Sequence, residues 1–306
     1  MRTVYLGTSE FAVAVLEPLA GSPHRPELVI TRPDRRRGRG QKLSPPPVAE
    51  QADRLGIELV QPDSVNDEQV LERIAAAAPE AVCICAYGAL IKEPLLSAFE
   101  MLNVHPSLLP RWRGAAPVER AIEAGDEETG VTIMRPTAEL DAGPICLQRP
   151  EPIRPDDDYG TLSARLAGLG GELLVEALDE RPPFRVQPGA GVTYAEKIGS
   201  GDRRLDPARG AAELARQVRA LHPHIGAWLE LPEGGRLGVH RAARAPVPAG
   251  PQAGELADVD GRLLFGTASG ALELLQVQPA GGRAMDAPAW LRGHGRAVAR
   301  QNPGRG

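Results

Sequence analysis

The hydrophobic residues of the first 136 positions change repeatedly between two spacings. Short apolar runs of strand length, such as TVYLGTS at 3–9, alternate with segments such as 10–20, in which apolar residues recur every three or four positions. The first pattern is typical of buried strands and the second of amphipathic helices. The predicted strands are 3–9, 27–31, 57–62, 80–88, 101–106 and 129–136, and the predicted helices are 10–20, 48–55, 67–78 and 116–125.

This alternation of strand and helix predicts an α/β fold with a Rossmann-like, doubly wound and mostly parallel sheet. In such sheets ligands bind beyond the carboxyl ends of the strands. The AYG at 86–88 and the NVHPS at 103–107 both lie at such ends. The turn after the first strand, LGTSEF, lacks the G-x-G-x-x-G pattern that holds a dinucleotide pyrophosphate, so NAD is not an expected cofactor.

The second half of the chain has a different organisation. A long amphipathic helix is predicted over 158–180, and the Gly- and Pro-containing segment 186–206 is typical of a linker. A helix at 210–223 then precedes a series of short strand-like runs, which predict a small OB-like β-barrel. These runs are 226–231, 236–242, 254–259, 261–267 and 271–277. We therefore expect a first domain of residues 1–185, a linker of 186–206 and a second domain of 207–306.

The composition is that of an ordinary globular protein, with 42% apolar and 25% charged residues. No apolar run reaches the roughly 18 residues of a membrane span. The N-terminus has no apolar core of signal-peptide length, so a cytoplasmic location is expected. Of the 3 cysteines, Cys83 and Cys85 lie in an apolar strand run, where buried thiols are expected rather than a disulfide or a metal site.

Basic residues are concentrated in two parts of a chain whose net charge is −5. Residues 32–42, RPDRRRGRGQK, hold six basic residues and one Asp, and residues 207–306 hold 12 basic and 8 acidic residues. The glycines at 38 and 40 predict a flexible loop. Such local asymmetry indicates a polyanionic partner, although an Arg-rich loop can equally be a solvated surface feature.

The stretch NVHPSLLPRWRGAAP at 103–117 carries the candidate chemistry. Asn103 and His105 are two residues apart, so on an extended strand they face the same side and can both donate to one carbonyl oxygen. Such a pair stabilises the oxyanion of an acyl transfer. Asp141, in the Gly/Pro turn ELDAGP, is a candidate to orient the imidazole. Ser107 lacks the G-x-S-x-G context of a nucleophile, which favours direct transfer to an amine or water. The pattern alone also allows a histidine that only caps the strand.

Seven segments together resemble the methionyl-tRNA formyltransferases, a family of enzymes that use 10-formyltetrahydrofolate. The resemblance spans nearly the whole chain. In order, the segments are GTSEFA, TRPDRRRGRGQKL, CAYG, NVHPSLLPRWRGAAPVERAI, GDEETGVTIM, LDAG and VTYAEKI.

The resemblance implies roles for individual residues. Asn103, His105 and Asp141 match the catalytic trio of the family. The folate-binding SLLP loop of the family corresponds to Ser107, Leu108, Leu109 and Pro110. The residues implied in tRNA binding are Arg36, Arg37, Arg39, Lys42 and Lys197. One departure is Pro106, which stands where glycine is common and biases His105 to an extended backbone.

The implied activity is formyl transfer from 10-formyltetrahydrofolate, as co-substrate, to the α-amino group of initiator methionyl-tRNA. We further expect a monomer with no bound metal, no NAD and no membrane association. Two alternatives remain at this point. One is a formyltransferase acting on a small amine such as a sugar nucleotide, and the other is a non-catalytic RNA-binding protein.

Overall fold

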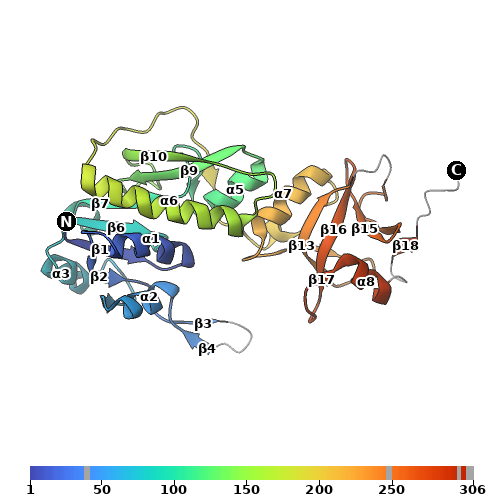
Figure 1. The fold of residues 1–306 in the computed structure, drawn as a ribbon, viewed down its shortest axis with the longest axis horizontal. Helices are drawn as coiled ribbons and strands as arrows, with labels where there is room; N and C mark the ends of the chain where they lie inside the picture. The colour runs from blue at the N-terminus through green and yellow to red at the C-terminus, as the bar shows by residue number, and fades with distance from the viewer. Residues whose placement is uncertain (38–41, 246–249, 295–297, 301–306) are drawn as a thin grey trace. The chain divides into compact units, whose positions relative to one another are not determined.

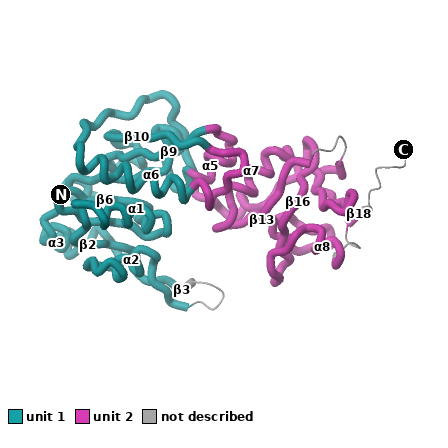
Figure 2. The backbone as a smooth tube through the Cα atoms, viewed as in Figure 1, with its two compact units in different colours: residues 1–117, 128–152, 163–195 teal, residues 118–127, 153–162, 196–306 magenta. Residues whose placement is uncertain are grey.

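The computed structural model divides into two compact units, each described below by itself (Figures 1 and 2). The described residues are 1–37, 42–245, 250–294 and 298–300. Unit 1 comprises residues 1–117, 128–152 and 163–195, and unit 2 comprises residues 118–127, 153–162 and 196–306. None of the helices in the described ranges is both long and apolar enough to cross a bilayer.

Unit 1 contains a seven-stranded sheet in the order β10-β9-β7-β6-β1-β2-β5. The five strands from β7 to β5 are parallel, and β9 and β10 are antiparallel to their neighbours. The prediction of a doubly wound, mostly parallel sheet is therefore confirmed. The strands are β1 Thr3–Gly7, β2 Pro26–Ile30, β5 Glu58–Val60, β6 Ala81–Cys85, β7 Met101–His105, β9 Glu128–Met134 and β10 Ile145–Pro152.

The apolar pattern did not predict β10. This strand, ICLQRPEP, lies at the edge of the sheet, and along it the more buried residues alternate with exposed ones. It also carries two prolines, which an edge strand tolerates because one side of its backbone makes no ladder hydrogen bonds. A strand of this kind has too few consecutive apolar residues to be recognised by periodicity.

Helices cover both faces of this sheet (Figure 1). On one face, Val70 and Ile74 of α3 pack in a core with Leu6 of β1 and Met101 of β7. On the other face α6 comes close to β7, because a Cβ at Gly170 would lie 2.9 Å from the Val104 side chain. The helices of the unit are α1 Glu10–Ala20, α2 Pro47–Leu55, α3 Glu68–Ala76, α4 Leu95–Ala98 and α6 Tyr159–Glu180, whose first four residues belong to unit 2. Nearly all of α5, Pro117–Ala124, also belongs to unit 2.

The basic segment is structured on both sides of its glycines. Strand β3, Arg35–Arg37, pairs antiparallel with β4, Lys42–Ser44. The prediction of a flexible loop over 32–42 is therefore wrong for these flanks. The hairpin is held by main-chain hydrogen bonds. A run of arginines therefore shows no alternation of apolar residues from which the strand could be predicted. Arg39 lies outside the described residues.

Unit 2 contains an antiparallel sheet with the strand order β12-β13-β16-β15-β14-β18, in which only β18 pairs in parallel, and β17 pairs with β16. The predicted small C-terminal β-domain is confirmed. Its strands are β12 Ala227–Glu230, β13 Arg236–Arg244, β14 Leu256–Val259, β15 Arg262–Gly266, β16 Ala271–Pro279, β17 Met285–Asp286 and β18 Ala299–Arg300.

Two helices, α7 (Ala211–Leu221) and α8 (Ala287–His294), pack on the core of unit 2. Leu214, Val218 and Leu221 of α7 are buried there, as their spacing predicted, and Trp290 of α8 is 1% exposed. Removal of so large an aromatic side chain from water is a major source of stability, of about 25 cal/mol for each Å² of apolar surface buried.

Two short segments that come before residue 163 in the chain belong to unit 2. In the 118–127 segment the Glu123 carbonyl accepts a hydrogen bond from Arg216 of α7 at 3.0 Å. In the 153–162 segment the Tyr159 ring stacks on His224 at 3.5 Å. The division into residues 1–185, a linker of 186–206 and residues 207–306 was based on the Gly and Pro residues of the sequence, and it remains a prediction.

Candidate active site

Strand β7 presents two candidate side chains on one face. Asn103 and His105 are i and i+2, while Val104 between them points to the opposite face, against α6. The strand is paired on both sides, with β6 in parallel and β9 in antiparallel. A strand held on both edges gives fixed positions to the side chains at its carboxyl end.

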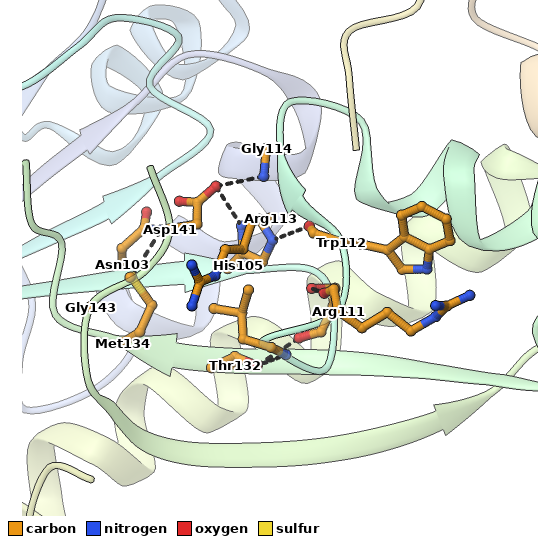
Figure 3. A network of polar contacts seen from close by, with 12 residues as sticks. Asn103, His105, Arg111, Trp112, Arg113, Gly114, Thr132, Met134, Asp141 and Gly143 are labelled. Carbon is orange, nitrogen blue, oxygen red and sulfur yellow. Dashed lines mark hydrogen bonds and ion pairs between the residues drawn. The ribbon is translucent and has the colours of Figure 1, made fainter. Parts of the chain in front are cut away.

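His105 is 4% exposed, and both of its ring nitrogens face polar groups (Figure 3). Nε2 lies 2.9 Å from the main-chain carbonyl of Trp112, and Nδ1 lies 3.7 Å from Oδ2 of Asp141. A carbonyl oxygen can only accept, so Nε2 carries a proton. The ring plane is fixed by this bond, and its Nδ1 edge is turned toward the carboxylate.

Asp141 lies in the loop between β9 and β10, and its Oδ2 accepts the main-chain N–H of Gly114 at 2.9 Å. Its φ is 47°, in the left-handed region. Two other residues at the sheet's carboxyl edge, Ala86 and Trp112, also have positive φ, of 43° and 63°. Such backbone strain in non-glycine residues persists where the surrounding structure enforces it, and it concentrates at functional sites.

The Asn103 amide lies beside a weak acceptor. Its Nδ2 lies 3.7 Å from the thioether sulfur of Met134, the residue opposite it on β9. A thioether is a poor hydrogen-bond acceptor. The amide can therefore exchange this contact for a carbonyl oxygen at small cost.

Side chains from β9 and β10 hold the SLLP loop. The Thr132 hydroxyl donates to the Ser107 carbonyl at 2.6 Å and accepts the Leu109 N–H at 3.2 Å. Gln148 donates to the Leu109 carbonyl at 2.8 Å. Ser107 is fully buried and its hydroxyl donates to the Arg111 carbonyl at 2.6 Å. The Ser107 side chain thus braces the loop.

The other members of the SLLP loop differ in exposure. Leu109 is buried, whereas Leu108 and Pro110 are half-buried. Leu108 packs over β9, because a Cβ at Gly130 would lie 2.6 Å from the Leu108 side chain. Pro110 gives its carbonyl to the N–H of Thr193 at 3.3 Å. The loop is thereby tied to a segment more than 80 residues later in the chain.

That later segment is also part of the site, although its composition predicted a linker and the resemblance gave a role there only to Lys197. The Thr193 hydroxyl accepts the Trp112 N–H at 2.9 Å, and its carbonyl accepts the Arg113 N–H at 2.9 Å. Strand β11, Tyr194–Ala195, pairs in parallel with β8, Arg113–Gly114. The close approach needs glycine at 114, where φ is 121° and a Cβ would lie 2.7 Å from the Ala195 carbonyl oxygen.

The residues expected to bind tRNA belong to other segments of the chain. Arg36 and Lys42 are exposed on the β3–β4 hairpin, and Arg37 pairs with Lys42 across it. Lys197 is exposed and follows β11, in unit 2. Their roles remain predictions.

Thiol chemistry is excluded at two cysteines of unit 1. Burial raises the pKa of the Cys83 and Cys85 thiols to about 12, so neither forms a thiolate nucleophile at neutral pH. Both lie within β6, as the apolar run predicted. Among the described residues no group of three or more His, Cys, Asp and Glu side chains is arranged to hold a metal ion.

The comparison with known families gives the class to which this α/β sheet and the C-terminal β-domain belong, the formyl transferases. Residues 1–178 match the formyl transferase family, and residues 197–295 match the formyl transferase C-terminal domain. The chain belongs, within this class, to the methionyl-tRNA formyltransferase family.

Two curated relatives show this membership. The methionyl-tRNA formyltransferase of Methylococcus capsulatus is 43% identical over 301 residues, which cover 96% of this chain and 97% of the relative. The methionyl-tRNA formyltransferase of Halorhodospira halophila is 42% identical, with 95% and 96% covered. Among solved structures, HypX from Aquifex aeolicus in complex with tetrahydrofolic acid shares the fold, with a TM-score of 0.66 and 19% sequence identity. The match covers 99% of this chain and 49% of the HypX chain.

Proposed function

We propose that this protein transfers the formyl group of 10-formyltetrahydrofolate to the α-amino group of initiator methionyl-tRNA, in the cytoplasm. The observation that carries the proposal is the grouping of Asn103, His105 and Asp141 at the carboxyl end of β7 (Figure 3). The grouping occurs in a chain that matches methionyl-tRNA formyltransferases over almost its full length.

In the proposed reaction the amine attacks the formyl carbon directly. A C–N bond forms, the bond from that carbon to N10 of the folate breaks, one proton leaves the amine and one reaches N10. The charge that develops on the formyl oxygen is met by two donors, Nδ2 of Asn103 and the His105 ring. Preorganised donors of this kind typically contribute about 10²–10³-fold in rate each.

Asp141 is proposed to orient the imidazole ring, whose Nδ1 edge it faces. Because Nε2 of His105 donates to Trp112, only a ring protonated on both nitrogens can also present an N–H at Nδ1. The carboxylate, 3.7 Å from Nδ1, faces this edge of the ring and is near enough to take part in moving the proton. The Gly114 N–H keeps the carboxylate in place.

The folate is proposed to bind along the SLLP loop and the neighbouring strand ends. Leu108 and Pro110 are half-buried and offer apolar surface, while Ser107 and Leu109 act from inside the loop by fixing its shape. This rigid, largely apolar border is suited to an aromatic ligand such as the pteridine or benzoyl group of a folate. No metal or NAD takes part in the proposed chemistry, and the working unit is a monomer.

The tRNA is proposed to contact the basic hairpin and unit 2. Arg36, Arg37, Arg39 and Lys42 would neutralise phosphates at the acceptor end, and Lys197 would lie near the entrance of the site. Phosphate contacts make affinity fall with salt, by roughly 0.7–0.9 in the log–log slope for each contact.

Two rival functions make different demands. A formyltransferase for a small amine such as a sugar nucleotide needs the same trio but gives no reason for a basic hairpin and a basic C-terminal third. A non-catalytic RNA-binding protein gives no reason for the strained, fully braced arrangement around His105 and Asp141.

The test uses formyl-labelled 10-formyltetrahydrofolate and four acceptors: initiator methionyl-tRNA, elongator methionyl-tRNA, free methionine and a dTDP-amino sugar. We expect label on the methionine of the initiator tRNA, with little on the other three. Preferential labelling of the amino sugar would establish the first rival. Labelling of none, with tRNA bound, would establish the second.

A further inference from the structure

Gln187, inside the segment that the sequence marks as a linker, is 7% exposed and holds the turn that carries Asp141. Its Nε2 donates to the main-chain carbonyl of Asp141 at 2.8 Å and to that of Gly143 at 2.8 Å. Both protons of the amide are thereby used, one on each side of Ala142. The turn is bound from outside by a single side chain.

The orientation of this amide is fixed by Arg113. Oε1 of Gln187 accepts hydrogen bonds from Nε of Arg113 at 3.1 Å and from Nη2 at 2.8 Å. A guanidinium only donates, so the amide cannot rotate by 180° without placing its NH₂ group against two further donors. Arg113 is itself 7% exposed, and its Nη1 reaches Glu139 at 3.3 Å.

The dipeptide Arg113–Gly114 therefore restrains both the side chain and the main chain of Asp141. The Gly114 N–H binds the carboxylate at 2.9 Å (Figure 3). The neighbouring Arg113 side chain holds the main chain of Asp141 through Gln187. Asp141 has a φ of 47°, a conformation that a non-glycine residue leaves when its restraints are removed. The restraints on the main chain thus decide where the carboxylate points.

We propose that Gln187 and Arg113 are positioning residues that set the orientation of Asp141 toward His105. This proposal rests on the function proposed above, since it assigns a role in the same reaction. Neither residue touches the reacting atoms. Their effect passes through the Asp141 turn, and it explains why the 186–195 segment must follow a defined path beside β8.

The first test is Gln187→Glu. A glutamate keeps an acceptor for Arg113 but replaces the NH₂ donor by an oxygen that faces two carbonyls. We expect the kcat for formyl transfer to fall by about 10- to 100-fold, as a misplacement near 1 Å can cause, with unchanged tRNA affinity. The matched control is Val186→Ala, one residue away and 89% exposed, which should turn over like wild type. Gln187→Met removes the same donors without adding charge and serves if the glutamate variant is unstable.

A double-mutant cycle separates positioning from general stability. If Gln187 acts through Asp141, Gln187→Glu should have less than about a two-fold effect on kcat in an Asp141→Asn background. The pH–rate profile of Gln187→Glu should also approach that of Asp141→Asn. An equal fold-loss in both backgrounds, or wild-type kcat in both Gln187 variants, would overturn the positioning role. Failure of wild type to formylate methionyl-tRNA would instead refute the proposed function and leave the cycle without a reaction to measure.

Discussion

Oδ2 of Asp141 lies 3.7 Å from Nδ1 of His105, beyond hydrogen-bond distance but within reach of strong charge attraction. The variant Asp141→Asn keeps the size of the side chain and an oxygen for the Gly114 N–H, and removes the charge. We predict a fall in kcat of about 10²–10⁴-fold, the usual contribution of acid–base groups, with little change in tRNA affinity.

The measurement is steady-state formylation combined with filter binding of methionyl-tRNA. Glu128→Gln, an exposed carboxylate of β9, is the charge-matched control and should behave like wild type. A kcat for Asp141→Asn within a few-fold of that control would show that the carboxylate takes no part in the reaction.

Gly143 offers a prediction about shape rather than charge. A Cβ at this position would lie 1.9 Å from the Arg135 carbonyl oxygen, so Gly143→Ala must displace the turn that carries Asp141. We expect a stability loss of about 1–3 kcal/mol, as overpacking typically causes, together with a lower kcat. Gly189→Ala is the control, because nothing lies within 4 Å of its added Cβ. Denaturant unfolding and turnover measured on both variants check this; equal behaviour of the two would contradict the packing argument.

The basic hairpin gives a prediction about salt. Arg36→Ala and Lys42→Ala should each weaken tRNA binding and reduce the slope of log affinity against log salt by roughly 0.7–0.9. Arg73→Ala is the control. Its side chain is in the last turn of α3, at the opposite edge of the sheet from the strand carboxyl ends, and it pairs with Glu58. An unchanged slope in both hairpin variants would mean that the hairpin is only solvated surface.

The lowered pKa of His222 gives a prediction for how the free energy of unfolding of unit 2 depends on pH. Burial lowers its pKa from the ordinary 6.5, helped by His240, Arg241 and His224 and opposed by Asp158, and its Nδ1 has no hydrogen-bond partner in the described chain. As the pH falls below about 6.5, the unfolded chain gains a proton that the folded chain does not accept, so stability is lost toward acid.

The variant His222→Asn should therefore show a smaller loss of stability between pH 7.5 and pH 5.5 than wild type. Urea midpoints at the two pH values measure it. Parallel shifts of both proteins would show that other groups account for the acid dependence.

The sequence was sufficient to predict Asn103 and His105 on one face of a strand end, because period-two alternation is a local property. It was not sufficient for the restraints on Asp141. Its partners Gly114 and Gln187 are 27 and 46 residues away, and contacts at such separations follow from how the chain folds back. Gln187 itself gave no signal of burial, because a polar residue beside Pro188 is also what an exposed linker contains.

The central claim is that the Asn103, His105 and Asp141 site formylates the amine of methionyl-tRNA. Single-turnover transfer of labelled formyl from 10-formyltetrahydrofolate to saturating initiator methionyl-tRNA tests it most directly, with wild type compared to His105→Asn. We predict formylmethionyl-tRNA from wild type and a rate roughly 10²–10³-fold lower in the variant, at equal tRNA affinity. A variant rate within a few-fold of wild type, or wild-type label found equally on free methionine, would contradict the account.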